Sequence, residues 1–134
     1  MQKVVLDSDI IIDYLRTGQG ILPKIVPLQS QGEIEIYISA VTIFELFVGS
    51  SSKRDELLIL DLINSFKKVV FDQNLAQFAG EIRRDKKLSV ALADFFIAAS
   101  ALFIDAQLAT RNKKHYQGIK GLKFFTPSAF TPLN

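Results

Sequence analysis

The feature that most constrains the fold of this chain is an alternation of short apolar, β-branched runs with longer segments of helical spacing. The expected strands are Lys3–Leu6, Glu35–Ile38, Lys68–Phe71, Gln107–Ala109 and Lys123–Phe125. Strands and helices that alternate in this way build parallel sheets with helices on both faces. The pattern therefore predicts a doubly wound α/β sandwich, in which function sits beyond the C-terminal ends of the strands.

The segments between the strands carry signals for the start and end of helices. We expect helices over Ile10–Arg16, Ala40–Val48 and Lys53–Phe66, from a cap at Asp72 to about Lys86, and over Ala91–Ile104. Asp9 can cap the first of these helices and Ser39 the second, and glycines follow both. A helical stretch over 21–31 is also expected, but Pro27 in its middle should kink or break it.

Composition predicts one domain over residues 1–134, with 49% apolar and 22% charged residues. The absence of cysteine excludes disulfides, thiolate metal sites and a cysteine nucleophile, and is compatible with the cytoplasm. The N-terminus reaches Asp7 after three apolar residues, too few for a signal peptide. The longest apolar run, Phe95–Ile104, is far shorter than the ~20 residues of a membrane-spanning helix. We expect a cytoplasmic protein with no membrane segment.

Two aspartates are expected near one edge of the sheet. Asp7 directly follows the apolar run 4–6, so it should project from the carboxyl end of a central strand. Asp94 opens an apolar helix, with the small residues Ala98 and Ala101 on its own face. Each aspartate also has a purely structural interpretation, because this residue type is favoured as an N-cap and in the first turn of a helix, near the positive end of the dipole.

Glu45 is the third candidate, because apolar residues surround it and leave its helix no solvent face of normal width. A buried, unpaired carboxylate is costly unless a cation neutralises it. The alternatives are a salt bridge to a distant basic residue or a tilt of the side chain toward solvent. Three carboxylates at one sheet edge would repel one another, and one or two Mg²⁺ or Mn²⁺ ions would neutralise them. Asp7, Glu45 and Asp94 are therefore the predicted metal-binding and catalytic residues.

Several stretches of the chain resemble the PIN-domain family, and in particular its VapC-like ribonuclease toxins of toxin–antitoxin pairs. The stretches are Val5–Asp13, Ile38–Gly49, Leu92–Ala101 and Leu108–Tyr116, together with the ending Gly121–Pro127. Their order and spacing reach over nearly the whole chain. The resemblance is specific for this reason, whereas any one stretch alone would be a weak signal.

The resemblance implies a PIN-like three-layer α/β/α sandwich with a five-stranded parallel sheet. It also implies an endoribonuclease that depends on Mg²⁺ or Mn²⁺, a homodimer and a VapB-like antitoxin partner. Asp7, Glu45 and Asp94 match the first three acids of the family. The expected reaction is attack on an RNA phosphodiester by a metal-activated water, leaving a 5′-phosphate and a 3′-hydroxyl.

The chain departs from the family at the fourth acid. Many members carry it in a segment Thr-x-Asn-x-x-Asp-Phe, and here His115 holds the place of that aspartate. Neutral imidazole is a poor Mg²⁺ ligand, so a site with four carboxylates is not expected, and Asn112 or water could complete the metal shell. A solvated residue at the start of the last helix is the more ordinary interpretation of His115.

Other residues are expected to support the site or to bind the substrate. Thr110 and Ser8 could position Asp7 or a metal-bound water, or could simply bond the local backbone. The predicted RNA-binding residues are Arg111, Lys113 and Lys114. If three of the 14 acidic residues bind cations, the other 11 carry less charge than the 16 Lys and Arg residues. The remaining net positive charge suits a polyanionic substrate. A second basic cluster, over 83–87, ends a helix and is interpreted as a solvated face.

The aliphatic residues of three segments, over 10–15, 21–22 and 57–60, exceed what one sheet face needs. They are expected to form core, and in part an interface with a second copy or with the antitoxin.

Three other interpretations stay open. A receiver-type phosphoacceptor domain has the same size and alternation, and Asp72 and Thr110 would be its phosphoacceptor and its threonine. A catalytically weakened PIN domain that only binds RNA is motivated by His115. Housekeeping RNA processing rather than toxicity is the third.

Overall fold

The computed structural model describes residues 1–84 and 87–127 and contains a parallel sheet in the order β3-β2-β1-β4. The strands are β1 (Gln2–Leu6), β2 (Ile34–Ser39), β3 (Lys67–Val69) and β4 (Gln107–Ala109). β1 pairs with β2 on one side and with β4 on the other. The direction of winding therefore reverses at β1, and the carboxyl ends of β1 and β4 flank the switch point where α/β sheets bind their ligands.

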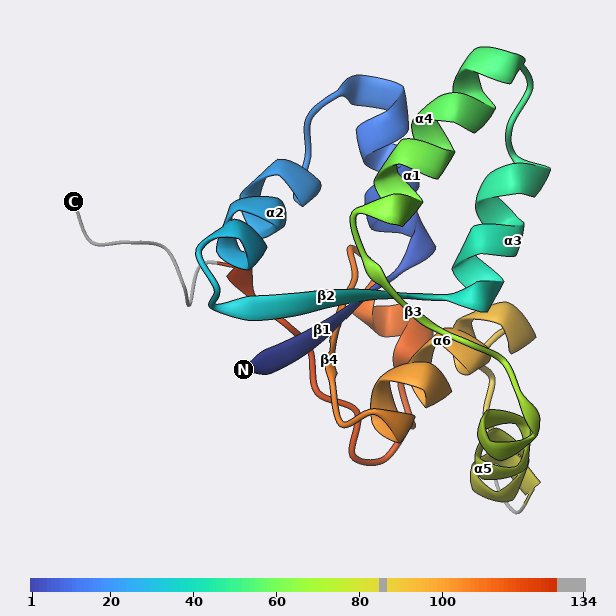
Figure 1. Ribbon diagram of the computed structural model, residues 1–134. Helices are drawn as coiled ribbons and strands as arrows, with labels where there is room; N and C mark the ends of the chain where they lie inside the picture. The colour runs from blue at the N-terminus through green and yellow to red at the C-terminus, as the bar shows by residue number, and fades with distance from the viewer. Residues whose placement is uncertain (85–86, 128–134) are drawn as a thin grey trace.

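Helices cover both faces of the sheet (Figure 1). They are α1 (Ser8–Thr17), α2 (Leu22–Ser30), α3 (Ala40–Val48), α4 (Lys53–Asn64), α5 (Gln73–Arg84) and α6 (Leu92–Phe103), followed by the short 3-10 helix η1 (Lys113–Tyr116). Side chains of β1 alternate between two cores: Val4 and Leu6 pack with α1, α2 and α4, whereas Val5 packs with α5 and α6. The predicted α/β sandwich is confirmed.

The sheet has four strands in the described residues, not the five that the resemblance implied. The segment predicted as the fifth strand does reach β4, but it forms a single bridge, between Leu108 and Phe124. Two backbone hydrogen bonds of 2.8 Å hold it there. Gly121 turns the chain with φ 84° just before this segment, and Pro127 has no N–H to donate just after it, so little chain is left to pair.

The predicted cap of the first helix is wrong, and the helical stretch over 21–31 is not broken at Pro27. α1 begins one residue before the predicted cap, with Asp7 as its N-cap and Asp9 inside the first turn. The side chain of Asp9 is engaged elsewhere, by residues that follow β4. α2 runs from Leu22 to Ser30 without interruption although it contains Pro27. Its apolar residues Leu22 and Ile25 are fully buried, and their packing outweighs the hydrogen bond that proline removes.

The predicted caps of two other helices are confirmed. α3 spans Ala40–Val48 as expected, and Ser39 Oγ accepts the N–H of Val41 at 3.1 Å. Asp72 Oδ1 accepts the N–H of Leu75 at 3.0 Å at the start of α5. The predicted end of that helix near Lys86 lies outside the described residues. Among the residues described, no helix has the length and apolar character needed to cross a bilayer.

The surplus of aliphatic residues is only partly exposed. The predicted interface residues of α1 and α2 are largely core, because Ile10, Ile11 and Leu22 are buried. The α4 residues Leu57, Leu58 and Leu60 do face solvent. A further apolar surface, which the sequence analysis did not identify, is formed on α3 by Phe44 and Val48, each 69% exposed.

Candidate active site

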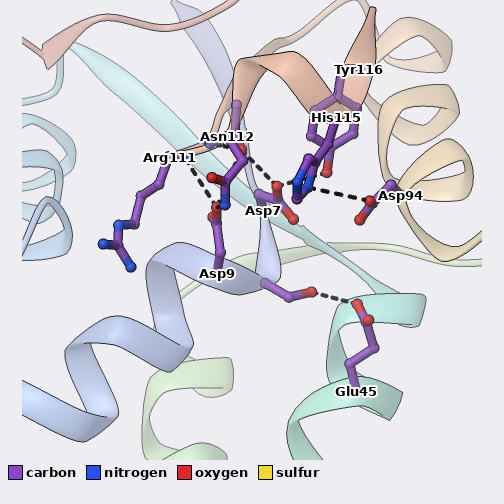
Figure 2. A network of polar contacts seen from close by, with 10 residues as sticks. Asp7, Asp9, Glu45, Asp94, Arg111, Asn112, His115 and Tyr116 are labelled. Atoms are coloured by element: carbon purple, nitrogen blue, oxygen red, sulfur yellow. Dashed lines mark hydrogen bonds and ion pairs between the residues drawn. The ribbon is translucent and has the colours of Figure 1, made fainter. Parts of the chain in front are cut away.

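The site is built around Asp7, which lies at the carboxyl end of β1, at the switch point of the sheet. Its backbone N–H donates to the carbonyl of Ala109 at 2.8 Å and so continues the pairing of β1 with β4. Its side chain is only 5% exposed and does not cap α1. Asp7 is thus held by the sheet, with its carboxylate turned to the residues that follow β4 (Figure 2).

Two hydroxyl groups donate to the same oxygen of Asp7. Thr110 Oγ1 and the phenol oxygen of Tyr116 each lie 2.7 Å from Asp7 Oδ2. Thr110 was among the predicted supporting residues, but Tyr116 was not. The sequence signal for Tyr116 was weak, since an aromatic residue in a short helix is usually core, and its ring is indeed buried. Burial and the neighbouring aspartates raise the pKa of Tyr116, so the hydroxyl keeps its proton.

Asp9 is a second acid of the site that the sequence analysis treated only as a cap. Its Oδ2 accepts hydrogen bonds from the backbone N–H of Arg111 at 3.1 Å and from Asn112 Nδ2 at 2.9 Å. Its Oδ1 is buried and has no hydrogen-bond partner among the described residues. Burial, and then the charge of Asp7, raise the pKa of Asp9 to about 6. The two acids of the segment 7–9 therefore repel each other at this edge.

Asp94 lies in the first turn of α6 and faces the same region (Figure 2). Burial and the charge of Asp7 raise its pKa, while His115 and Tyr116 act in the opposite direction. His115 Nδ1 lies 3.8 Å from Asp94 Oδ2, and the imidazole is 61% exposed. The histidine in the place of the fourth acid is thus solvated, as expected, and it also forms an ion pair with Asp94 whenever it is protonated.

Glu45 is half-buried rather than deeply buried, which corrects the argument that led to it. Apolar residues surround it because α3 exposes two of them to solvent, not because the helix is enclosed on all sides. Its Oε1 lies 2.6 Å from Ser8 Oγ, which in turn lies 3.0 Å from Thr42 Oγ1. Ser8, which follows Asp7 at the start of α1, therefore ties Glu45 of α3 to the segment that carries Asp7.

The predicted acids face one region, but each has its own hydrogen-bond or ion-pair partner. Thr110 and Tyr116 hold Asp7, Ser8 holds Glu45, and His115 lies beside Asp94. Among the residues described, no three His, Cys, Asp or Glu side chains stand close enough together to hold a metal ion. A shared ion would require at least one of these carboxylates to rotate toward the others.

Of the predicted RNA-binding residues, Arg111 lies beside an acid of the site, since its backbone N–H donates to Asp9. Arg111 forms a salt bridge with Asp13 of α1, with Nη1 3.3 Å from Oδ1. Lys113 lies over the ring of Phe124, 5.6 Å from its centroid, and Lys114 is exposed. Asn112, predicted as a possible metal ligand, donates instead to Asp9.

The alternative receiver-type site does not assemble. Asp72 follows β3 at the far side of the sheet from β4, whereas Thr110 follows β4. Asp72 serves as the exposed N-cap of α5, and Thr110 donates to Asp7.

The second basic cluster, over 83–87, also differs from a solvated face at one position, because Arg83 donates to the carbonyl of Val90 and lies over the ring of Phe95.

The chain is similar to known proteins over most of its length. Residues 4–119 match the PIN domain. Ribonuclease VapC10 of Mycobacterium tuberculosis is 30% identical over 123 residues, which cover 90% of each chain. Ribonuclease VapC1 of Methanocaldococcus jannaschii is 28% identical over 128 residues, 92% of this chain and 87% of that one.

Solved structures show the same fold. A chain of the DNA-bound VapBC complex of Salmonella typhimurium aligns with a TM-score of 0.81 and 23% identity, over 93% of this chain and 98% of that one. A chain of a toxin–antitoxin complex from Klebsiella pneumoniae aligns with a TM-score of 0.68 and 27% identity, over 92% and 97%. Sequence and fold together lead to one conclusion: the chain belongs to the PIN-domain family.

Proposed function

We propose that this protein is a divalent-metal-dependent endoribonuclease and the toxin of a toxin–antitoxin pair. The proposal rests on Asp7 at the switch point of a PIN fold, with Asp94 and Glu45 facing the same region (Figure 2), in a chain 30% identical to a ribonuclease VapC over 90% of its length. A single PIN domain would supply the whole activity, and it would act in the cytoplasm.

The donor set of the site suits a hard divalent cation. Burial and the charge of Asp7 raise the pKa values of Asp9 and Asp94, and the buried Oδ1 of Asp9 has no donor among the described residues. Carboxylate oxygens are the ligands that Mg²⁺ and Mn²⁺ prefer. We assign Asp7, Asp94 and Glu45 as the residues that would hold the ion. When bound, such an ion would lower the pKa of water and neutralise charge on a phosphoryl group.

The protein's own residues then have separate tasks. Thr110 and Tyr116 fix the orientation of Asp7, and Ser8 does so for Glu45. One of the three carboxylates would take the proton from the attacking water. The burial around Asp7 limits competing water at the reacting centre.

Cationic side chains beside the acids would hold the RNA backbone. Arg111, Lys113 and Lys114 lie in the segment that follows Thr110 after β4, and all three are exposed. Each phosphate contact of this kind adds affinity that falls as salt rises. Arg111 would exchange Asp13 for a phosphate, since the existing pair is partly exposed and therefore weak.

The partners follow from the relatives and from the surface. Similar structures are complexes named VapBC or toxin–antitoxin, so a VapB-like antitoxin is the expected inhibitor. The exposed aliphatic face of α4 borders a hollow that also contains Glu45, where an apolar segment could bind next to the site. The exposed Phe44 and Val48 of α3 suit the interface of a homodimer.

The test is cleavage of a mixed RNA substrate by purified protein in Mg²⁺, in Mn²⁺ and in EDTA. Asp7→Asn and Asp94→Asn should each reduce the rate by about 100-fold or more, because each removes a ligand charge. Asp61→Asn, which changes an exposed acid of α4, is the matched control and should cleave like the wild type.

Absence of cleavage by wild-type protein with either metal would contradict the nuclease. RNA binding without turnover would then identify a weakened PIN domain, and a gel shift with the same RNA would detect it. Cleavage that persists in EDTA would contradict metal dependence alone.

A further inference from the structure

The hydrogen bonds at Asp7 are divided unequally between its two oxygens. Both hydroxyl donors, Thr110 Oγ1 and the phenol of Tyr116, converge on Oδ2 at 2.7 Å. The carboxylate is 5% exposed, so there is little water available to compete with these donors. Two short bonds to one oxygen fix the rotation of the carboxylate, in the region that Asp94 and Glu45 also face (Figure 2).

Tyr116 is well placed to hold this orientation. It lies at the end of η1, which packs against α6, and its ring is 2% exposed within the core formed by α5 and α6. Its ring also stacks edge-on with Phe124, at 6.5 Å between centroids. The hydroxyl is therefore positioned by packing on a rigid part of the fold, as residues that position a metal ligand must be.

The site shows a paired replacement at this point. Many members of the family have Asp-Phe at the end of this segment, where this chain has His115 and Tyr116. The first change removes a negative charge from the site, and the second adds a hydroxyl donor to Asp7. With fewer carboxylates to attract a cation, more depends on how well the remaining ones are oriented before the ion arrives.

We propose that Tyr116 is a positioning residue of the site, whose hydroxyl, together with Thr110, anchors Asp7 Oδ2 and so orients this carboxylate for the divalent cation that the acids would hold. The inference rests on the proposed metal-dependent function and extends it to a residue outside the acids. Loss of the anchor lets the carboxylate rotate, so an ion must order it on binding. Removing such a partner of a ligand typically weakens metal binding by about 10-fold to 100-fold.

The test is Mn²⁺ binding to RNA-free protein by calorimetry, for wild type and Tyr116→Phe. The family places Phe at this position, so the variant is expected to fold, and circular dichroism checks this. We expect Tyr116→Phe to raise the dissociation constant for Mn²⁺ by about 10-fold. Tyr37→Phe is the matched control. Tyr37 is a residue of β2, and its ring lies under Lys67, away from the acids of the site. Loss of the Tyr37 hydroxyl should therefore leave the affinity for Mn²⁺ unchanged.

A second pair of variants tests the same oxygen without changing the ring. Thr110→Val should weaken Mn²⁺ binding, and Thr110→Ser, which keeps the donor, should restore it. If Thr110 had only a structural role, the substitutions would lower the melting temperature, but Thr110→Ser and Thr110→Val would not differ in their affinity for Mn²⁺.

Two outcomes would overturn the proposal, and they are distinguishable from failure of the proposed function. If wild type binds Mn²⁺ and cleaves RNA but Tyr116→Phe binds equally well, the positioning role is wrong and the nuclease stands. If wild type binds no Mn²⁺, both are wrong.

Discussion

At the scale of single residues, the acids of the switch point are held in a state of mutual repulsion. Asp9 shows this most clearly, because burial and the charge of Asp7 raise its pKa to about 6 from 3.8. The bonds from Arg111 N–H and Asn112 reduce this shift but do not cancel it. The carboxylate is therefore kept where it costs stability, which is common at sites that bind a cation.

The shift has a consequence for stability. A group whose pKa is higher in the folded state favours folding while it is protonated, and this contribution is lost as pH rises through the folded pKa. The free energy of unfolding should therefore fall between about pH 4 and about pH 6 on account of Asp9, and Asp94 adds to the fall. The Asp9→Asn variant should lack the part of this fall that is due to Asp9. It should therefore be more stable than the wild type above about pH 6.

Urea unfolding in EDTA at both ends of this range, followed by circular dichroism, would measure the effect. Asp61→Asn, an exposed acid, serves as the control and should keep the pH dependence of the wild type. A difference between Asp9→Asn and wild type that is the same at both pH values would contradict the interpretation.

At the scale of elements, α2 shows packing outweighing local propensity. The helix contains Pro27 near its middle, where a missing N–H leaves the carbonyl one turn earlier without its bond. Leu22, Ile25 and Leu28 nevertheless face the core on one side of the helix. The exposed side carries the proline, where its ring meets solvent rather than a neighbouring helix.

Replacing this proline should therefore stabilise the protein. Pro27→Ala restores a backbone donor on an exposed face of the helix, which should raise the free energy of unfolding by about 1–3 kcal/mol. Alanine also gives the unfolded chain more conformational entropy than proline, and this reduces the gain. Pro23→Ala is the control, because Pro23 lies in the first turn, where no backbone donor is needed, and it should bring no such gain. Thermal denaturation would compare the two, and an equal effect at both positions would argue against this explanation.

At the scale of the whole molecule, the surface carries apolar groups that the fold leaves uncovered. Phe44 of α3, with Val41, Phe71 and Phe96, lines a shallow apolar hollow of about 300 Å³. The exposed leucines of α4 form a separate apolar area. Uncovered apolar groups of this kind mark sites of association, so two surfaces are available for two partners.

A charged residue on the α3 surface should dissociate the proposed homodimer into monomers. Phe44→Asp places a carboxylate in the apolar hollow, and we expect size-exclusion chromatography with light scattering to shift from dimer to monomer. Leu57→Asp, a substitution of similar exposure on α4, is the control and should leave the dimer intact. The reverse result would assign the dimer to α4 and leave α3 for another partner.

The sequence by itself determined the fold class, the strand that carries Asp7 and the helix caps at Ser39 and Asp72. These features depend on local patterns of apolar spacing and on side chains that bond their own backbone, and such patterns need no knowledge of distant residues. The order of the motifs along the chain also indicates the family, because it depends on the sequence alone.

Only the tertiary structure decided which groups meet at the switch point. Tyr116 lies 109 positions from the carboxylate it binds, and Asp9 bonds Asn112 across 103 positions. Packing against other elements likewise decided three further features. The segment predicted as a fifth strand forms only one bridge, α2 continues through Pro27, and α3 exposes apolar residues. Contacts between residues far apart in the chain depend on how the layers stack, and that is a property of the folded molecule rather than of any local segment.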